Sequence, residues 1–303
     1  MRNAFIETLF DLAERDERVW LLCGDLGYSV LERFAQHYPG RFVNVGVAEQ
    51  NMIGVAAGLA LCGKIVFVYS IANFPVMRPL EQIRLDVCYH NLPVKIVSVG
   101  GGLAYGPAGY SHHAIEDLAV MRSMPNMTVL APGDPVETRL ATQAIVSQPG
   151  PCYLRLGKAG EPVIHVTPPA FEIGKAIFYR EGRDVTLIST GGMLQTVVTA
   201  ADQLREAGCA ARVLSMHTVQ PLDEAAVMAA ARETGALITV EEHGVGGLGS
   251  AVGETLARGG WPVKFVPLRL THTAVSHADS QEALRTSLGL SVQGIVAAAR
   301  SIS

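Results

Sequence analysis

Short runs of apolar and β-branched residues alternate along the chain with longer stretches in which apolar residues recur every three to four positions. The first pattern predicts buried strands, and the second predicts amphipathic helices. In the first half we expect strands at 19–23, 42–45, 65–69, 94–99, 127–130 and 152–154, and helices at 4–14, 51–61, 80–89, 115–124 and 135–147. Strands that alternate with helices predict parallel sheets with helices on both faces.

The alternation stops at 157–174 and then resumes. This stretch contains Pro162, Pro168 and Pro169 and shows no helical period, which is typical of a linker. Beyond it we predict strands at 185–189, 211–215, 237–240 and 263–267, and helices at 194–207, 223–233, 249–258 and 292–301. We therefore predict an α/β protein with two doubly wound domains and mainly parallel sheets. The domains are 1–158 and 176–303, and the linker is 159–175.

Composition narrows the class of protein. The 303 residues are 49% hydrophobic and 17% charged, which suits densely packed domains, and the net charge of −4 argues against nucleic acid as the main ligand. No apolar stretch reaches the ~18 residues that a membrane helix needs, and no secretory signal precedes the first helix, so we expect a cytoplasmic protein without membrane contact. The five scattered cysteines lack metal-ligand spacing and predict buried free thiols.

The most specific chemistry surrounds Glu49. An apolar strand breaks at Gly46 and a helix-like run follows, so this carboxylate lies at a strand-to-helix junction beside Val47, Ala48 and Met52. Apolar surroundings raise the affinity of a carboxylate for a proton, and we expect Glu49 to hold or share a proton near neutrality. Taken alone, the same glutamate also fits a residue that stabilises the first turn of a helix.

The helix after Glu49 carries Gly54 and Gly58, four residues apart, although glycine lowers helix stability by about 1 kcal/mol relative to alanine. Two glycines on one face predict the close approach of another backbone, across a subunit interface or within a crowded core.

Two loops at the ends of predicted strands can reach a ligand, because α/β proteins bind ligands at the carboxyl ends of parallel strands. One is 24–29, with Asp25 and Ser29, which on its own also fits an ordinary Asp-Gly turn. The other is the glycine-rich segment 100–117, which contains His112. A histidine at a loop end suits proton transfer, although many such histidines are surface or capping residues.

The block Gly-Val-Ala-Glu-Gln-Asn-Met-Ile-Gly-Val-Ala-Ala-Gly-Leu-Ala at 46–60 resembles the pyrimidine-domain signature of the transketolase family. Four further segments resemble the family in the same order, namely 24–29, 67–84, 100–117 and 150–158, and stretches near 217 and 240 resemble its C-terminal domain. The resemblance covers nearly the whole chain. It implies a pyrimidine-binding domain followed by a transketolase C-terminal domain.

The resemblance also implies thiamin diphosphate as the cofactor and assigns roles to residues. Glu49 would hydrogen-bond N1′ of the aminopyrimidine, and Asp25 would approach the thiazolium side. Phe74 matches one member of an aromatic cluster against the aminopyrimidine, and Ile71 stands where relatives often have Phe. His112 would contact the substrate and the cofactor amine, and the substrate-binding positions are Ser29, His112, Lys158 and Arg2.

The family holds the Mg²⁺ and diphosphate with Gly-Asp-Gly followed by an Asn, and no Gly-Asp-Gly occurs here. We predict no metal ligands on this chain, since Glu241, Glu242 and His243 are consecutive and cannot converge well on one ion. The resemblance therefore implies the C-terminal subunit of a two-component enzyme. An N-terminal, diphosphate-binding subunit would supply the Mg²⁺ ligands in an α2β2 heterotetramer.

The implied reaction is transfer of a two-carbon ketol unit. Family members that act on ketose phosphates tend to have Asp at the position of Ala108, and many have His at the position of Gly100. Their absence predicts a non-standard donor or acceptor. The alternatives are the β subunit of a 2-oxo acid dehydrogenase, a carboligase similar to deoxyxylulose-phosphate synthase, and a non-catalytic assembly subunit.

Overall fold

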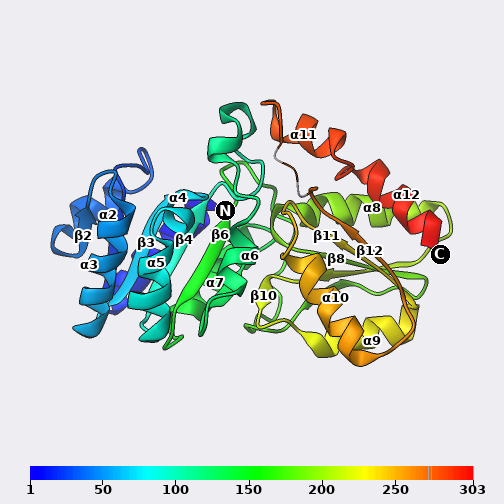
Figure 1. The fold of residues 1–303 in the computed structure, drawn as a ribbon, viewed down its shortest axis with the longest axis horizontal. Coiled ribbons are helices and arrows are strands. Elements are labelled where there is room, and N and C mark those ends of the chain that lie inside the picture. The colour runs from blue at the N-terminus through cyan, green and yellow to red at the C-terminus, as the bar shows by residue number, and fades with distance from the viewer. Residues whose placement is uncertain (272, 274, 303) are drawn as a thin grey trace.

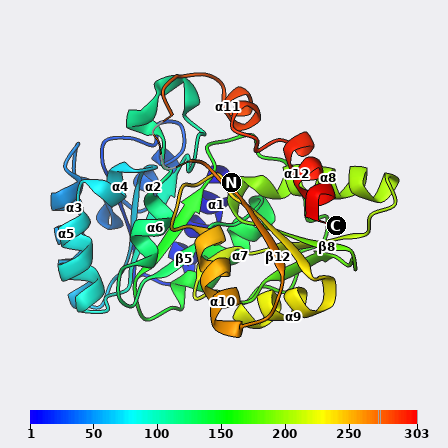
Figure 2. The same cartoon turned by 45° about the vertical axis from the view of Figure 1, so that its right-hand side comes forward.

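Two twisted sheets, each with helices on both faces, make up the computed structural model, which describes residues 1–271, 273 and 275–302 (Figure 1). Ser303, the last residue of the second predicted domain, lies outside the described residues. The N-terminal sheet and the C-terminal sheet stand side by side, and the turned view in Figure 2 shows α9 and α10 below the second sheet and α11 and α12 above it. The prediction of doubly wound α/β architecture is confirmed.

The first sheet has the strand order β10-β5-β6-β4-β3-β1-β2. Its strands are β1 (Val19–Cys23), β2 (Phe42–Asn44), β3 (Ile65–Ile71), β4 (Val94–Val99), β5 (Thr128–Leu130), β6 (Cys152–Leu156) and β10 (Thr218–Gln220). All neighbours are parallel except β10, which runs antiparallel to β5. The carboxyl ends of the parallel strands therefore meet at one edge, where the candidate loops emerge.

Side chains of β3 alternate between two cores, as expected for a strand with period two. Phe67 and Tyr69 pack with residues of α1 (Arg2–Arg15) and α7 (Pro135–Val146). Val66 and Val68 pack on the opposite face with residues of α3 (Glu49–Leu61), α4 (Phe74–Met77), α6 (Asp117–Arg122) and the π-helix η2 (Ile83–Tyr89). This packing fixes α3 and α4 beside the same end of β3.

The second sheet has the order β12-β11-β8-β9-β7. Its strands are β7 (Ile177–Arg180), β8 (Val185–Ser189), β9 (Ala211–Ser215), β11 (Ala236–Val240) and β12 (Lys264–Leu268), and only β7 is antiparallel to its neighbour. The helices α8 (Leu194–Glu206), α11 (Gln281–Ser287) and α12 (Val292–Ile302) contribute to the core on one face. The other face packs against α9 (Glu224–Thr234) and α10 (Leu248–Gly259).

Several short elements differ from the predictions. The single helix expected at 80–89 is instead α5 (Leu80–Gln82) followed by η2, and the helix expected at 115–124 is the shorter α6. The elements β7, β10, α11 and α2 (Glu32–His37) had no prediction, because each is too short to show a clear period. The 3₁₀ turns are η1 (Pro39–Arg41), η3 (Gly106–Ala108), η4 (Tyr110–His112) and η5 (Gly191–Met193).

The two halves of the chain are joined by more than the linker. No helix or strand is assigned between the end of β6 and the start of β7, while β10, which follows β9 in the chain, completes the first sheet. The boundaries at 158 and 176 remain a prediction, but the first sheet takes a strand from beyond them. Within the described residues, no helix is long and apolar enough to cross a membrane.

The cysteines only partly match the expectation of buried thiols. Cys23, Cys88 and Cys152 are buried, Cys209 is half-buried, and Cys62 is exposed. Cys62 follows the last residue of α3, where the chain turns at the surface, so its apolar neighbours in the sequence do not bury it.

Candidate functional site

Glu49 is the first residue of α3, just after Gly46 (φ 72°) has turned the chain away from β2. Its side chain is only 3% exposed. Nη1 of Arg78 lies 2.9 Å from both Oε1 and Oε2 of Glu49. The apolar surroundings expected for Glu49 are therefore wrong in one respect, because the cation Arg78, at the end of a neighbouring helix, compensates the buried carboxylate.

Arg78 also covers an aromatic ring. It follows the last residue of α4 and lies four positions after Phe74, so the two side chains share one face of the helical turn. The guanidinium carbon of Arg78 is 3.9 Å from the centroid of the Phe74 ring. One planar cation thus contacts both the carboxylate of Glu49 and the face of Phe74, two residues that the family resemblance assigns to the aminopyrimidine.

His112 contacts the cluster of Glu49, Arg78 and Phe74 through the Phe74 ring. It ends the short η4 turn, is partly exposed, and lies edge-on to Phe74 with ring centroids 5.3 Å apart. Its Nδ1 is 3.0 Å from Oγ of Ser111. The backbone of Ser111 is in turn held by Asn73, whose Nδ2 donates to the Ser111 carbonyl at 3.4 Å. The structure therefore brings His112, Phe74 and Glu49 together through Arg78, although they come from three separate segments.

Glu49, Arg78, Phe74 and His112 form a row of contacting side chains. Tyr105 extends this row toward two further cations. Its ring centroid is 6.1 Å from that of His112 and 4.8 Å from Nζ of Lys158. Burial raises the pKa of the Tyr105 hydroxyl, and the nearby charge of Arg2 opposes that rise. Arg2 and Lys158 thus lie near one ring at the end of the row opposite Glu49. Sequence reasoning did not assign a role to Tyr105.

The loop after β1 is connected less directly. Asp25 and Ser29 are exposed and have positive φ angles of 57° and 62°. The backbone of Asp25 donates to Oδ1 of Asn44 at 2.9 Å, and Oδ1 of Asp25 accepts from Nδ2 of Asn44 at 3.1 Å. Non-glycine residues in this conformation are uncommon and often mark functional loops. Ile71, the last residue of β3, is half-buried and pairs with Val99 rather than with this loop.

Gly24 leaves room between this loop and Glu49. A Cβ at Gly24 would lie 3.7 Å from Oε1 of Glu49 and 4.0 Å from Oγ of Ser70. The Ser70 hydroxyl is fully buried and has no hydrogen-bond partner, which is rare for a buried polar atom. A carboxylate, an aromatic face and an unpaired hydroxyl near a glycine, which adds no side chain of its own, fit a flat, nitrogen-containing ring. The residues present therefore fit the aminopyrimidine of thiamin diphosphate.

The acidic residues at the end of β11 have protein partners. Glu241 accepts from the backbone N–H groups of Leu248 and Gly249 at the start of α10, both at 2.7 Å, and burial raises the pKa of Glu241 to about 7. Glu242 accepts from Nη2 of Arg285 at 2.7 Å. Across the described part of the chain, no three His, Cys, Asp or Glu side chains are grouped to hold a metal ion.

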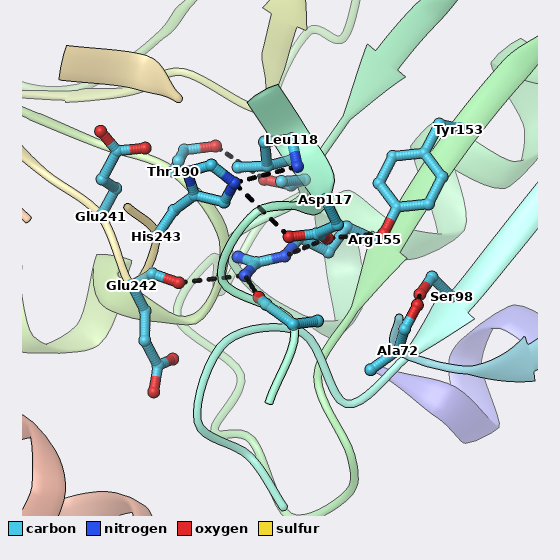
Figure 3. A network of polar contacts seen from close by, with 12 residues as sticks. Ala72, Ser98, Asp117, Leu118, Tyr153, Arg155, Thr190, Glu241, Glu242 and His243 are labelled. Carbon is cyan, nitrogen blue, oxygen red and sulfur yellow. Dashed lines mark hydrogen bonds and ion pairs between the residues drawn. The ribbon is translucent and has the colours of Figure 1, made fainter. Parts of the chain in front are cut away.

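A buried polar network behind the site joins the two sheets (Figure 3). Oδ2 of Asp117 accepts from the Tyr153 hydroxyl at 2.6 Å and from Nε of Arg155 at 2.9 Å. Nη2 of Arg155 donates to the carbonyls of Ala114 at 2.7 Å and Glu242 at 3.0 Å. Arg155 lies on β6, the strand that leads to Lys158, so the network anchors that strand to the second sheet.

His243 completes this junction as a neutral acceptor. Its Nε2 accepts from the backbone N–H groups of Leu118 at 3.1 Å and Ala119 at 3.3 Å, at the start of α6. Its Nδ1 lies 3.0 Å from the carbonyl of Gly244, which fixes the tautomer with the proton on Nδ1. Burial lowers the pKa of His243 to about 4. The 3.6 Å separation between Nε2 and Oδ1 of Asp117 is therefore not an ion pair near neutral pH.

Comparison with known proteins matches the chain to two family descriptions. Residues 1–160 match "Transketolase, pyrimidine binding domain", and residues 174–295 match "Transketolase, C-terminal domain". A solved structure described as "Split gene transketolase, inactive beta4 tetramer" has a TM-score of 0.92 and 39% identity, and the match covers 99% of this chain and 97% of that one.

The curated relatives fall into two groups. Some match this chain over nearly their full length, and others match it over only part of their length. The chain is 40% identical to an apulose-4-phosphate transketolase subunit of Phocaeicola vulgatus, over 97% of this chain and 94% of that protein. It is 40% identical to a 6-deoxy-6-sulfo-D-fructose transketolase subunit of a Clostridium species, over 100% and 94%. It is 38% identical to the 1-deoxy-D-xylulose-5-phosphate synthase of Thermomicrobium roseum, over 97% of this chain but 47% of that protein.

Proposed function

The chain belongs to the transketolase family, and on that premise we propose that it is one subunit of a split, thiamin-diphosphate-dependent transferase that moves a two-carbon ketol unit. The observation that carries the proposal is the contact of one planar group, the Arg78 guanidinium, with both Glu49 and Phe74. A carboxylate and an aromatic face that one planar group can contact at the same time are what an aminopyrimidine needs.

Each residue of the site would have a separate role. Glu49 would hold a proton at N1′ of the aminopyrimidine, and the Phe74 ring would bind its face. His112 would move a proton at a substrate oxygen, and Asp25 would lie on the thiazolium side. Thiamin diphosphate, when bound, supplies the stabilisation of the carbanion.

Two cations are available for an anionic group of the substrate. Lys158 and Arg2 lie near Tyr105, at the far end of the row from Glu49. A phosphate or another anion held there would place the reacting end of the substrate toward His112. Ser29, on the loop after β1, would be a third contact, which the sequence motif alone supports.

A second polypeptide would complete the active site. Relatives named as subunits match this chain over 94% of their length, whereas the named synthase contains about twice as much chain. We place the ligands of Mg²⁺ and diphosphate on that partner, in an α2β2 assembly. The isolated chain should then bind thiamin diphosphate and Mg²⁺ weakly, and calorimetry with and without the partner measures this. Mg²⁺-dependent micromolar binding by the isolated chain would contradict the divided site.

Glu49→Gln tests the role of the carboxylate. The amide cannot share a proton with N1′, so exchange of the C2 proton of the cofactor should slow at least about 100-fold in the assembled enzyme. NMR after acid quenching follows this exchange. Glu7→Gln, a change in an exposed glutamate of α1, is the control. Unchanged exchange in the Glu49 variant would remove this residue from the mechanism.

A second candidate reaction is the condensation catalysed by carboligases similar to 1-deoxy-D-xylulose-5-phosphate synthase. The 38% identity to such a synthase favours it over a 2-oxo acid dehydrogenase subunit. A donor screen of the assembled enzyme separates the two reactions. Turnover of ketose phosphates or related ketoses without decarboxylation supports ketol transfer, and turnover of a 2-oxo acid with release of CO₂ supports the carboligase.

A further inference from the structure

The Arg78 guanidinium has a geometry that resembles that of a bound ligand. It is flat, it lies 3.9 Å above the Phe74 ring, and its Nη1 donates to both oxygens of Glu49 at 2.9 Å. No other side chain in the described part of the chain forms an ion pair with Glu49. Arg78 thus occupies both Glu49, the only carboxylate in this described cluster, and one face of the Phe74 ring.

We propose that Arg78 is a place-holder in the aminopyrimidine site, which competes with the cofactor for Glu49 and Phe74 and must swing out when the cofactor enters. This inference rests on the proposed function. Both contacts that Arg78 makes are contacts that the aminopyrimidine would need, and one face of a ring accepts only one planar group. Arg78 therefore sets how fast and how tightly the cofactor is bound.

The environment of Arg78 permits this exchange. Its side chain is 42% exposed, whereas that of Glu49 is 3% exposed, so the arginine can turn into solvent while the carboxylate stays in place. An arginine in water remains well hydrated, and the exposed part of its ion pair contributes little stability. In the absence of the cofactor, the arginine instead supplies the counter-charge that a buried carboxylate requires.

The arrangement predicts a particular kinetic effect. A ligand that binds only the open state shows an apparent affinity reduced by the fraction of molecules that are open, so an arginine docked about 90% of the time weakens binding about tenfold. Removing the arginine should raise the association rate constant of thiamin diphosphate by about that factor and leave the dissociation rate constant nearly unchanged. An arginine that instead contacts the bound cofactor would, when removed, raise the dissociation rate constant.

The experiment compares three variants in the assembled enzyme with Mg²⁺. Arg78→Ala removes the guanidinium, and Arg78→Lys keeps a counter-charge for Glu49 but loses the planar group. Arg84→Ala is the matched control, because Arg84 is exposed and pairs only with Glu81 in the described structure. Stopped-flow fluorescence gives both rate constants for thiamin diphosphate, and calorimetry gives its Kd.

The expected result is faster association and about tenfold lower Kd in Arg78→Ala, a smaller change in the same direction in Arg78→Lys, and no change in Arg84→Ala. If the alanine variant fails to assemble, the lysine variant decides the question. Equal or weaker binding by the folded Arg78 variants would overturn the place-holder but not the proposed function. If the wild-type assembly itself binds no thiamin diphosphate, the proposed function fails, and this inference fails with it.

Discussion

Replacing Gly54 and Gly58 by alanine tests whether the exposed face of α3 is a contact surface in the assembled enzyme. Both glycines are exposed, and a Cβ added to either would meet no atom within 4 Å. Within the described residues, no crowded core therefore explains them. Leu61 is 69% exposed on the same helix, and Tyr89 is 72% exposed on η2, which contacts α3, so these two helices also expose large apolar side chains.

The effect on the isolated chain follows from helix propensity. Neither glycine has a positive φ, so alanine fits both positions without strain. Each substitution should stabilise the chain by about 1 kcal/mol, and the pair by about 2 kcal/mol. For a chain of 303 residues, that corresponds to a rise in Tm of roughly 3 °C.

The effect on assembly should have the opposite sign. If another backbone packs closely against this face, two added methyl groups overpack the contact at a cost of about 1–3 kcal/mol, which is about 5- to 150-fold in affinity. Gly253→Ala is the matched control, because Gly253 lies inside α10 and its Cβ would make only an ordinary contact of 3.5 Å with Phe265. That variant should be stabilised without any change in assembly.

The assay combines denaturant unfolding of the isolated chain, at a concentration where it is monomeric, with a titration against the partner polypeptide that is followed by sedimentation or light scattering. Unchanged partner affinity in a stabilised Gly54→Ala/Gly58→Ala variant would refute the contact surface. A loss of stability in the isolated variant would show that the space around Gly54 and Gly58 is not open, and would refute that premise.

Three further outcomes follow from the site and its supporting network. Tyr153→Phe should lower the free energy of unfolding by about 1–3 kcal/mol, measured with denaturant, because it leaves the buried Asp117 without its 2.6 Å donor. The pKa of His243 is about 4 in the folded chain and about 6.5 in the unfolded chain, so the unfolded chain takes up a proton at higher pH. The free energy of unfolding should therefore fall as pH drops from about 6.5 to 4, and the contribution of His243 to this fall is roughly 3 kcal/mol. The raised pKa of Glu241 acts in the opposite sense, so the His243 effect is isolated by comparing wild type with His243→Gln. The difference in unfolding free energy between the two should change by roughly 3 kcal/mol in favour of the variant as pH falls from about 6.5 to 4. Lys158→Ala should raise KM for an anionic substrate about tenfold or more and leave KM for an uncharged analogue unchanged, as steady-state kinetics can check.

The sequence predicts best those features that depend on local pattern. Long apolar strands such as β4 and the junction at Glu49 could be located because strand period, glycine and the family block coincide in a short segment. The network of Asp117, Arg155 and His243 could not, because its members are up to 126 positions apart and meet only when the two sheets pack. Arg78 lies between these cases. Its spacing of four from Phe74 was a visible signal, but its contact with Glu49 depends on how α3 and α4 share one face of the first sheet.

The geometry around Gly100 bears on the choice of substrate. Gly100 has φ 85°, and a Cβ there would clash with the ring of Tyr105. The family resemblance leads us to expect a histidine at this position in members that act on ketose phosphates, and in this chain a phenol from five positions later lies against Gly100. That phenol lies beside Lys158, while Ala108, on the same loop, offers no carboxylate to a substrate hydroxyl. On the proposed function, Lys158 would still offer a cation to an anionic group, and the hydrogen-bonding groups beside it would differ from those expected for the family. Because unpaired polar groups decide such preferences, we expect a donor or acceptor with a hydroxyl pattern different from that of xylulose 5-phosphate.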